Sequence, residues 1–550
     1  MRTPLPIPCR GILLLALVSL WPASVLAQPA KASAAELAQL RQQAEKHERN
    51  GDWEAAFTAY CHLYVADRTS PALREKLHTV LRRVQQIRRH RDPSFQQFVA
   101  GLTLPNGLDL FAEVIQRVPS VYADKEKATP QNLWQFAVEE LDRALGHATF
   151  TKSFVNSPTG HKLNEFRDSL RSDWAKRPIR DHREARSTLR QLIATAQDQL
   201  AVRVPAALAV EAACGACSGL DEYTVFLTPT SPTDIPPAVD LTAAGLHLAI
   251  EHDQLIIDYI APHSWVALNY PELKRGQRIL LLNGRTMTGA GLSEALAALR
   301  HPSRGMHQLE VTTSTGEMTV VIPISIPSVY GIRMMPGTPV GYIRIGTFLN
   351  STPAELDDAI ATLKASEARA IIIDLRGNHG GSFLAAVETA RRLLPAGVIV
   401  STQGQVSDIA NQVFTSTSGM SAHDIPLVLL IDTETASAAE VLAAALKDND
   451  RAEIVGMPSF GKGTIQYPLR LVTLDDVDPT TGQKRPKTGT VRLTIAKLIA
   501  PTSGPISGLG VIPDIVESNP TLQIEVATKT AIEKIGSTMM PMPPLLPMNP

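Results

Sequence analysis

A serine and a lysine in the C-terminal half of the chain stand in settings suited to a nucleophile and its base. Ser437 follows an apolar run at 427–431, which predicts a buried strand, and precedes an apolar-periodic stretch at 438–447, which predicts a helix. A hydroxyl at a helix start lies beside free N–H groups and the positive end of the helix dipole, which would stabilise a developing oxyanion. Lys462 lies 25 positions later (462 minus 437), in a glycine turn. We interpret the two residues as a catalytic pair.

Lys462 can act as a base near neutral pH only if its pKa falls well below the ordinary value of ~10.4. A fall of ~3 units corresponds to about 4 kcal/mol, which burial in an apolar site can supply. The neighbouring Phe460, Ile465 and Leu469 offer such surroundings. Gln466 lies on the same side as Lys462 if this segment is extended, so its amide would hold the amine without adding charge.

Other interpretations of the same residues stay open. Ser437 and Glu440 also form a capping-box pattern, in which the serine only satisfies helix N–H groups. Lys462 between two glycines is also typical of an exposed turn. A Ser/His/Asp triad is a further alternative, with His379 or another of the 14 histidines as its base. A phosphate-binding loop at 456–463 is excluded, because glycine replaces the final Ser or Thr of that motif and a strand pattern follows.

The elements around these residues predict an α/β core at 327–518 with a mostly parallel sheet. From Val340 onward, apolar strand patterns alternate with helical patterns at 353–366 and 382–394, and GVIVST is predicted as a further buried strand. Ligand sites of such sheets lie beyond the carboxyl ends of the strands. Three motifs follow directly after predicted strands: DLRGNHGG, TETASAAE and FGKGTIQ. The sequence therefore predicts that they share one rim of the sheet.

Residues 236–326 follow a proline-rich linker at 231–239 and contain about five short strand patterns and one helix pattern. Asn283-Gly284 is a strong hairpin-turn signal. The order of elements resembles a PDZ domain, whose carboxylate-binding loop corresponds here to Gly245, Leu246, His247 and Leu248. Such a loop would bind the terminal carboxylate of a peptide through backbone N–H groups. A β module that only packs against the core is the alternative.

The N-terminal half is predicted to be helical, in two parts at 28–92 and 93–235. The first part resembles one tetratricopeptide-like helix pair, with Gly51 at its start and Pro71 opening the second helix. No second copy follows at the ~34-residue period of stacked repeats. We therefore predict a single helical hairpin, which either binds a protein partner or serves as a packing appendage.

The leader predicts export. Arg2 and Arg10 precede or border an apolar segment at 11–20, and Ala27 closes a small-residue cleavage site, so residues 1–27 have the pattern of a cleaved signal peptide. An uncleaved membrane anchor is the alternative, although the apolar run is shorter than the ~20 residues of a membrane span. We expect a periplasmic or extracellular protein without stable membrane insertion. A formal charge of −1 over 550 residues argues against a nucleic-acid partner.

Three cysteines, Cys61, Cys214 and Cys217, lie beyond the predicted leader. The C-x-x-C spacing of the last two is compatible with a local disulfide in an oxidising compartment or with two ordinary buried thiols. A zinc site would need a second pair of ligands, and no His or Cys pair at suitable spacing lies nearby.

Over roughly 220–517 the chain is similar to the carboxy-terminal processing peptidases, also called tail-specific proteases. The likeness is carried by DEYTVFLTP, the PDZ-like segment, GYIRIGTF, DLRGNHGG, TASAAEVLAAALKDNDRAEIVGMPSFGKGTIQ and VRLTIAKLIAPTSGPISGLGVIPDI. The resemblance implies that Ser437 is the nucleophile, Lys462 the general base and Gln466 the residue that orients the lysine. It also implies polypeptide substrates with accessible C-termini and no metal or cofactor.

The same resemblance implies an oxyanion hole made by the N–H of Ala438 and of a glycine in the pair Gly380 and Gly381, with a supporting role for Asp448. The chain departs from the family pattern at Gly377 and His379, where the family has Asn and Pro, which bears on the shape of the oxyanion loop. His247 bears on which terminal residue fits the PDZ-like loop. Residues 519–550 are predicted to be a partly disordered Pro/Met-rich tail.

These features predict an exported serine endopeptidase that binds the C-terminal end of a polypeptide through its PDZ-like domain and cleaves through an acyl-enzyme. The alternative is a catalytically silent peptide-binding scaffold with the same fold. Loss of the serine or the lysine would be its signature, and both residues are present.

Overall fold

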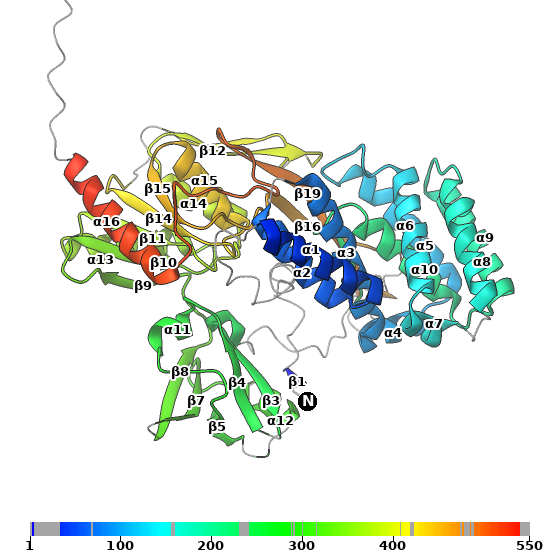
Figure 1. The fold of residues 1–550 in the computed structure, drawn as a ribbon, viewed down its shortest axis with the longest axis horizontal. Coiled ribbons are helices and arrows are strands. Elements are labelled where there is room, and N and C mark those ends of the chain that lie inside the picture. Colours follow the sequence, from blue (N-terminus) through cyan, green and yellow to red (C-terminus); the bar gives the residue numbers. More distant parts are fainter. Residues whose placement is uncertain are drawn as a thin grey trace, which may run out of the picture.

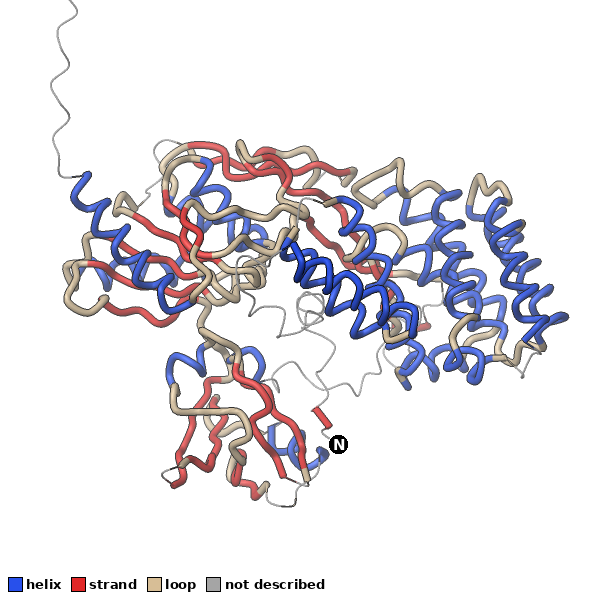
Figure 2. The backbone as a smooth tube through the Cα atoms, viewed as in Figure 1, coloured by secondary structure: helices blue, strands red, loops and turns tan. Residues whose placement is uncertain are grey.

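The computed structural model describes most of the chain, and Figures 1 and 2 show its arrangement. The described residues are 3–4, 34–67, 70–155, 160–229, 241–252, 254–287, 289, 292–299, 301–314, 316–406, 409–417, 423–473, 476–477, 484–485 and 489–538. The predicted leader at 1–27 (Thr3 and Pro4 apart), the predicted linker at 231–239 and the end of the tail at 539–550 lie outside them.

Three helices open the N-terminal region: α1 (Ala34–Asn50), α2 (Trp53–Ala66) and α3 (Pro71–Arg91). Gly51, with φ of 78°, makes the tight connection between α1 and α2. Pro71 occupies the first turn of α3, and Ser70 Oγ accepts a hydrogen bond from Leu73 N–H at 3.3 Å. The helix pair expected from the sequence is α2 and α3, which we call the hairpin, and α1 packs against α2 as a third helix.

A second helical block follows the hairpin. Its helices are α4 (Pro93–Ala100), α5 (Leu104–Arg117), η2 (Val118–Ser120), α6 (Pro130–Leu145), α7 (Ala148–Phe154), α8 (Gly160–Ser172), η3 (Trp174–Lys176), α9 (His182–Leu200) and α10 (Pro205–Ser218). α10 is buried along almost its whole length and packs against α5 and α6. Cys214 and Cys217 lie inside this helix as free, buried thiols, as does Cys61 in α2. Among the described helices, none is by itself long and apolar enough to cross a membrane, and α4 with α5–η2 would qualify only as a pair bent by 112°.

The β module comprises η5 (Leu241–Ala244), β3 (Leu246–Glu251), β4 (Gln254–Ile260), α11 (Trp265–Asn269), β5 (Ile279–Leu282), β6 (Arg285–Thr286), α12 (Leu292–Leu299), β7 (Met306–Thr313) and β8 (Gly316–Pro323). It has its own apolar core and lies apart from the other sheets, at the bottom of Figure 1. Asn283 and Gly284 have φ of 50° and 77° and join β5 to β6, which confirms the predicted two-residue turn. β1 (Thr3–Pro4) lies antiparallel along β3, opposite its partner β4.

A six-stranded sheet in the order β21-β15-β14-β11-β10-β9 forms the centre of the C-terminal half. Its strands are β9 (Val329–Met334), β10 (Val340–Ile345), β11 (Ala370–Asp374), β14 (Leu427–Ile431), β15 (Ala452–Gly456) and β21 (Ile515–Val516). Neighbouring strands are parallel except β9 and β10, which are antiparallel. The predicted combination of a helical N-terminal region with a mostly parallel α/β core is confirmed.

Helices cover both faces of this sheet, which explains the continuous apolar runs of its central strands. Ile371 and Ile373 of β11 face the layer made by α13 (Thr352–Ala365), α14 (Phe383–Leu393) and α15 (Ala438–Asp448). Ile372, between them, faces α16 (Pro520–Thr538) on the other side. The predicted disordered tail is therefore wrong for residues 520–538, because the apolar residues Ala527, Ala531 and Ile535 of α16 are buried against the sheet.

A second sheet, in the order β13-β12-β19-β16, is antiparallel. It contains β12 (Gly397–Gly404), β13 (Val413–Ser416), β16 (Thr464–Arg470) and β19 (Thr490–Ala500), with β2 (Val225–Leu227) and β20 (Gly504–Pro505) paired to β19. β17 (Asp476–Val477) and β18 (Lys484–Arg485) extend the connection between β16 and β19. GVIVST is β12, a strand as predicted, but it belongs to this antiparallel sheet and not to the parallel one. An apolar run predicts burial but does not say which sheet the strand joins.

Candidate active site

The three motifs lie at one rim of the parallel sheet, as predicted. β11 ends at Asp374, β14 at Ile431 and β15 at Gly456, and these three strands are adjacent and parallel. The segments that leave them carry DLRGNHGG, TETASAAE and FGKGTIQ. Because the carboxyl ends of parallel strands meet at the same edge, the candidate nucleophile, base and oxyanion loop come together there.

Ser437 occupies a strained turn directly before α15. Its φ of 59° and ψ of −118° lie outside the regions favoured by residues with a side chain. The neighbouring Ala436 N–H donates to Asn378 O at 2.9 Å, which ties the turn to the loop after β11. Strain of this kind persists only where the surrounding contacts impose it.

Lys462 is buried, with 3% of its surface exposed, in the turn that precedes β16. Burial lowers its pKa to about 8, Arg492 adds to the lowering, and Glu440 opposes it. The amine lies 5.6 Å from the centroid of the Tyr223 ring. Within the described residues no hydrogen bond joins this amine to the Ser437 hydroxyl, and such catalytic bonds often form only when substrate binds.

One buried carboxylate bridges the two candidate residues. Glu440 Oε2 accepts from the backbone N–H of Ser437 at 2.7 Å and from that of Lys462 at 2.8 Å. Oε1 accepts from Gly461 N–H at 2.6 Å and from Ser459 Oγ at 2.5 Å. Burial raises the pKa of Glu440, and these donors partly offset that effect. The capping-box pattern predicted only the bond to Ser437, whereas the same side chain also fixes the lysine turn.

The candidate oxyanion loop, residues 376–381, packs directly against the serine. A side chain at Gly380 would place its Cβ 2.8 Å from Ser437 Cβ and 3.0 Å from the nitrogen of Ala438. Its φ of 103° also favours glycine. Gly380 N–H donates to Asn378 Oδ1 at 2.8 Å, so this amide is already used inside the loop. Of the predicted glycine pair, Gly381 is left as the second candidate donor beside Ala438.

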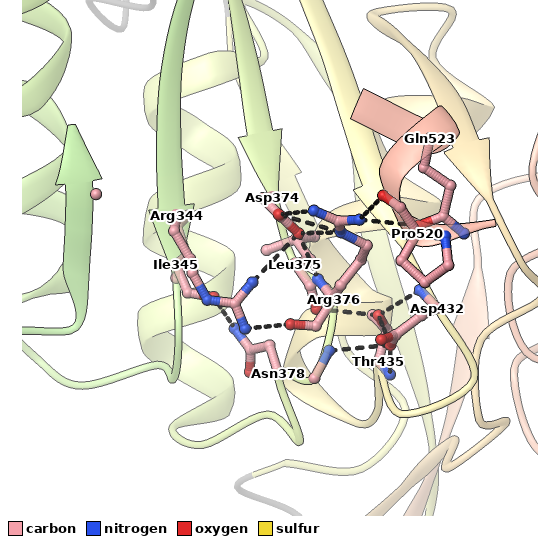
Figure 3. A network of polar contacts seen from close by, with 12 residues as sticks. Arg344, Ile345, Asp374, Leu375, Arg376, Asn378, Asp432, Thr435, Pro520 and Gln523 are labelled. Carbon is pink, nitrogen blue, oxygen red and sulfur yellow. Dashed lines mark hydrogen bonds and ion pairs between the residues drawn. The ribbon is translucent and has the colours of Figure 1, made fainter. Parts of the chain in front are cut away.

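A buried ionic network holds this loop to the sheet (Figure 3). Asp374, at the end of β11, accepts from Arg376 Nη2 at 2.6 Å and lies 3.3 Å from Arg344 Nη1. Burial opposes ionisation, but the two guanidinium groups outweigh it and hold the pKa of Asp374 well below its usual range. Arg376 Nη1 also donates to Pro520 O at 2.9 Å and to Gln523 Oε1 at 3.0 Å, so α16 supports the loop from its far side.

The same network joins the oxyanion loop to the turn that carries the serine. Asp432 Oδ1 accepts from Gly377 N–H at 2.9 Å and from Thr435 N–H at 3.0 Å. Thr435 Oγ1 donates to Leu375 O at 3.0 Å. Figure 3 shows Leu375, Asp432 and Thr435 close together in this network. The two loops therefore behave as one unit, built by side chains that DLRGNHGG and DTETAS supply.

Gln466 donates its side-chain hydrogen bond to a residue other than Lys462. Its amide donates to Thr464 Oγ1 at 2.7 Å, and a register shift between Ile465 and Gln466 interrupts the pairing of β16 with β19. The expected hydrogen bond from Gln466 to Lys462 is absent from the described structure. Lys462 lies before the strand begins, so regular alternation does not extend from one residue to the other.

Asp448 lies at the opposite end of α15 from Ser437. Its carboxylate accepts from the N–H groups of Thr502 and Ser503 at 2.8 Å each and from Ser503 Oγ at 2.5 Å. Burial alone would raise the pKa of Asp448, but these bonds lower it. Its contribution is to anchor the end of the helix to the connection between β19 and β20.

Replacing Asp448 with asparagine is expected to lower the free energy of unfolding by about 1–2 kcal/mol at pH 7, because three donors lose a charged acceptor. Chemical denaturation measures it. The lowered pKa means that the wild-type contribution is present above the unfolded pKa of ~3.9 and is lost as pH falls through the folded value. The difference between the two proteins should therefore shrink in acid. Asp450→Asn, at an exposed turn, is the control and should change stability by less than about 0.5 kcal/mol.

His379 lies in the oxyanion loop but is poorly suited to be a base. Burial lowers its pKa to about 4, and a hydrogen bond to the backbone of Glu434 opposes that effect only in part. Its Nδ1 atom has no hydrogen-bond partner in the described part of the chain. A Ser/His/Asp triad requires a carboxylate on this nitrogen to orient the ring. The geometry therefore disfavours the triad that used His379.

The four residues of the predicted carboxylate-binding loop lie in the β module, away from the serine. Gly245 precedes β3 with φ of 84°, and a side chain there would place its Cβ 2.1 Å from Ser264 Cβ. Leu246, His247 and Leu248 begin β3. The module approaches the rim at Pro262, whose carbonyl oxygen lies 3.8 Å from the Cβ position of Gly377.

Two further residues near Lys462, Arg492 and Tyr223, were not predicted from the sequence. Arg492 on β19 donates from Nε to Tyr223 O at 3.1 Å, and the Tyr223 ring faces the Lys462 amine. Both are buried. The only signals were their places in DEYTVFLTP and VRLTIAK, two segments of the family resemblance that carry no recognisable chemistry of their own.

Comparisons with known proteins relate this chain to peptidases. Residues 339–517 match Peptidase family S41. A carboxyl-terminal-processing protease of Synechocystis sp. is 29% identical over 372 residues, which cover 66% of this chain and 78% of the relative. The chloroplastic carboxyl-terminal-processing peptidase 2 of Arabidopsis thaliana is 36% identical over 178 residues, 32% of this chain and 31% of the relative.

A solved structure and a further curated relative are also similar to this chain, at lower identity. The photosystem II D1 C-terminal processing protease aligns with 77% of this chain and 96% of its own, at 21% identity and a TM-score of 0.37. CtpA of Bacillus subtilis, a carboxy-terminal processing protease, is 26% identical over 299 residues, 54% of this chain and 60% of the relative. The resemblance to the carboxy-terminal processing peptidases is confirmed: this chain carries a domain of peptidase family S41 at residues 339–517.

Proposed function

We propose that this chain is a serine endopeptidase that processes the C-terminal part of polypeptides, with Ser437 as nucleophile and Lys462 as general base. The observation that carries the proposal is a buried lysine of pKa about 8 whose turn shares the Glu440 carboxylate with the turn of a strained serine. Holding that amine in a buried site disfavours the folded state by roughly 3 kcal/mol at neutral pH. A peptide-binding scaffold would have no use for such an arrangement.

The proposed chemistry follows from the groups at the rim. Neutral Lys462 takes the proton of Ser437 Oγ as this oxygen attacks the scissile carbonyl, and the carbonyl oxygen becomes an oxyanion. The N–H groups of Ala438 and Gly381 stabilise that charge. The protonated lysine then gives its proton to the leaving amine, which leaves an ester on Ser437, and water hydrolyses the ester by the same steps.

Recognition of the substrate end is assigned to the β module. A peptide added to a sheet edge binds by main-chain hydrogen bonds, and a terminal carboxylate binds to backbone N–H groups at the end of that edge. The edge of β3 accepts an antiparallel strand, since Thr3 and Pro4 pair there with Ile250 and Ala249. The turn at Gly245 lies at the start of β3, where the carboxylate of a bound peptide would be placed.

The proposal is tested by incubating the purified full chain with an unstructured polypeptide at pH 8 and analysing the fragments by mass spectrometry. We expect internal peptide bonds to be cleaved, and a fluorophosphonate probe to modify Ser437 and stop cleavage. Cleavage that continues after Ser437 is fully modified would contradict the assignment of the nucleophile. A folded protein that cleaves no polypeptide and takes up no probe would support the scaffold.

Amidation of the substrate C-terminus is expected to lower kcat/KM about tenfold, because the charged hydrogen bonds to the loop at Gly245 are lost. The measurement compares a free and an amidated peptide of the same sequence. Gly245→Ala should remove the difference, since its Cβ would collide with Ser264. Gly276→Ala is the matched control, because Gly276 has φ of 86° but open space at its Cβ position. Equal rates for both peptides with the wild type would refute this role of the module.

Export through residues 1–27 is part of the same proposal. Cleavage after Ala27 would give a mature chain that begins at Gln28. Sequencing the N-terminus of the protein recovered from its producing cells tests it, and an intact Met1 would contradict it.

A further inference from the structure

The hairpin α2–α3 packs directly against the two turns that carry Ser437 and Lys462. One apolar cluster combines buried residues of the hairpin with residues beside the site: Phe57, Tyr64, Leu73, Tyr223, Ala436 and Phe460. Ala436 precedes the serine, and Phe460 lies two residues before the lysine. In Figure 1 these helices are drawn across the region of β16, the strand that directly follows the lysine turn in the sequence. The hairpin therefore packs against the candidate site and is not a distant appendage.

A chain of hydrogen bonds runs from the hairpin to the lysine turn. Tyr64 OH donates to Gly508 O at 2.8 Å in a buried contact, and Gly508 N–H donates to Gly461 O at 2.8 Å. Gly461 is the residue before Lys462. The backbones are packed closely, since a Cβ at Gly461 would lie 2.9 Å from the carbonyl carbon of Gly508. A displacement of Tyr64 would therefore be transmitted through these two hydrogen bonds to Gly461 and so to Lys462.

A second link runs from α3 to the aromatic ring that faces the amine. Arg74 Nη2 donates to Glu222 Oε1 at 3.0 Å, and Glu222 immediately precedes Tyr223. Arg74 also covers Gly508, because a Cβ there would lie 2.5 Å from Arg74 Nη1. The hairpin thus holds both sides of the lysine site, Gly461 on one and Tyr223 on the other.

Little water fits between these parts. The cavity lined by the hairpin, Glu222, Tyr223, Phe460, Gly461 and Gly508 measures about 50 Å³. A single water needs at least ~10–15 Å³ of such volume, so the space holds only a few molecules. The hairpin therefore limits the water beside the turn that carries Lys462 and contributes to the burial of that turn.

We propose that the hairpin is part of the catalytic apparatus: Tyr64 and Arg74 are positioning residues that hold Gly461 and Tyr223 around Lys462 and keep water from its amine. The proposal rests on the Ser437–Lys462 pair proposed above. Loosening the hairpin admits water, hydrates the ammonium form of the lysine and reduces the fraction of enzyme that holds a neutral base. The hairpin is then a point at which a bound protein could raise or lower activity without touching the substrate.

The test compares pH profiles of kcat/KM for the full chain and for Tyr64→Phe/Arg74→Gln. The double variant should move the midpoint of the alkaline rise upward by about one pH unit, lower the rate at pH 7 about tenfold, and recover near pH 10, since the neutral fraction falls tenfold per pH unit below the midpoint. Tyr64→Phe alone, which keeps the ring in place, should move the midpoint the same way by less, and it decides the question if the double variant does not fold.

Matched controls come from the same helices. Tyr60 OH bonds to Glu48 at 3.0 Å and Lys76 Nζ bonds to Glu48 at 2.7 Å, so both contacts stay within α1–α3. Tyr60→Phe/Lys76→Gln should leave the midpoint unchanged. An equal shift of the pH midpoint in the control variant would show that the hairpin contributes only to overall stability. That result would overturn the proposal.

The other titratable groups that face the lysine amine are unchanged in these variants: Glu440 on α15, Arg492 on β19, His379 in the oxyanion loop and Tyr223. A wild-type rise near pH 8 that disappears in Lys462→Met, together with an unmoved midpoint in Tyr64→Phe, would overturn the role of the hairpin and leave the catalytic pair intact. A wild-type profile that Lys462→Met leaves unaltered would instead refute the pair itself.

Discussion

Lys462→Met is expected to lower kcat/KM for a peptide substrate by about 10²–10⁴-fold, the usual contribution of a positioned general base. Methionine fills a similar volume but has no lone pair that could take the proton of Ser437. Ser437→Ala should reduce the rate at least as much, because no acyl-enzyme can form. Steady-state cleavage of a fluorogenic peptide measures both, with folding checked by circular dichroism.

The direction in which kcat/KM changes with pH follows from the pKa of Lys462. With a pKa lowered to about 8, Lys462 is neutral in roughly a tenth of the molecules at pH 7 and in most of them at pH 9. A base must be neutral to act, so kcat/KM should rise with pH to about pH 8 and level off above it. The residual rate of Lys462→Met should lack that rise.

Stability should change in the opposite direction from activity. The lysine binds a proton more weakly in the folded chain than in the unfolded one, so its burial is unfavourable below pH 8 and becomes neutral above the unfolded pKa of ~10.4. Lys462→Met is expected to be up to roughly 3 kcal/mol more stable than the wild type at pH 7, with the difference closing between pH 8 and 10. Denaturant unfolding at both pH values measures it.

Lys364→Met provides the control for both measurements. Lys364 is half-exposed on α13 and pairs at 3.5 Å with Asp424, so its loss should leave the rate unchanged and stability within about 1 kcal/mol. A Lys462→Met protein with wild-type kcat/KM would show that the lysine is not the base. An inactive variant that is much less stable at every pH would show a structural role instead.

The rim of the sheet could be predicted because it follows from local patterns. Strands such as 427–431 and 370–374 are apolar on both faces, which predicts parallel strands covered by helices, and parallel strands bring the segments after them to one edge. Ser437 and Lys462 each follow such a strand. The α16 helix was missed because its apolar residues are spaced by four and are followed by a Pro/Met-rich end that drew the interpretation toward disorder.

The contacts that hold the candidate site residues in place join parts of the chain that are distant in sequence. Tyr64 reaches Gly508, 444 residues away, and no local pattern marks either residue. The expected hydrogen bond from Gln466 to Lys462 is not formed in the described structure, where Gln466 donates to Thr464 and a register shift interrupts β16 beside it. Glu440 was noticed, but only as a cap for its own helix. Local sequence patterns therefore predicted where each candidate residue lies along the chain. The residues that hold Lys462 in place became visible only in the folded structure.

Glu440→Gln is the second change with a large expected effect. Each carboxylate oxygen accepts two hydrogen bonds, and in either orientation the glutamine NH₂ would face two buried donors. Each unsatisfied donor costs about 1–3 kcal/mol, so unfolding should become easier by roughly 2–6 kcal/mol. The rate should fall about 100-fold or more, because a shift near 1 Å in the spacing of Ser437 and Lys462 is enough to cause such a loss. Thermal unfolding and peptide cleavage at pH 9 measure the two effects.

Measuring the rate at pH 9 separates the effect of a misplaced Lys462 from the effect of a protonated one. Glu440 carries a negative charge beside Lys462 and raises its pKa, so removing the charge alone should lower that pKa and leave more neutral base at pH 7. If charge were the main contribution of Glu440, the variant would gain activity near pH 7. If the bridge positions the two turns, it loses activity at every pH, while Glu453→Gln, which loses only a surface pair with Lys534 at 3.4 Å, does not. We expect the second outcome, because the carboxylate accepts hydrogen bonds from the backbone N–H groups of both Ser437 and Lys462 and so holds the two turns together.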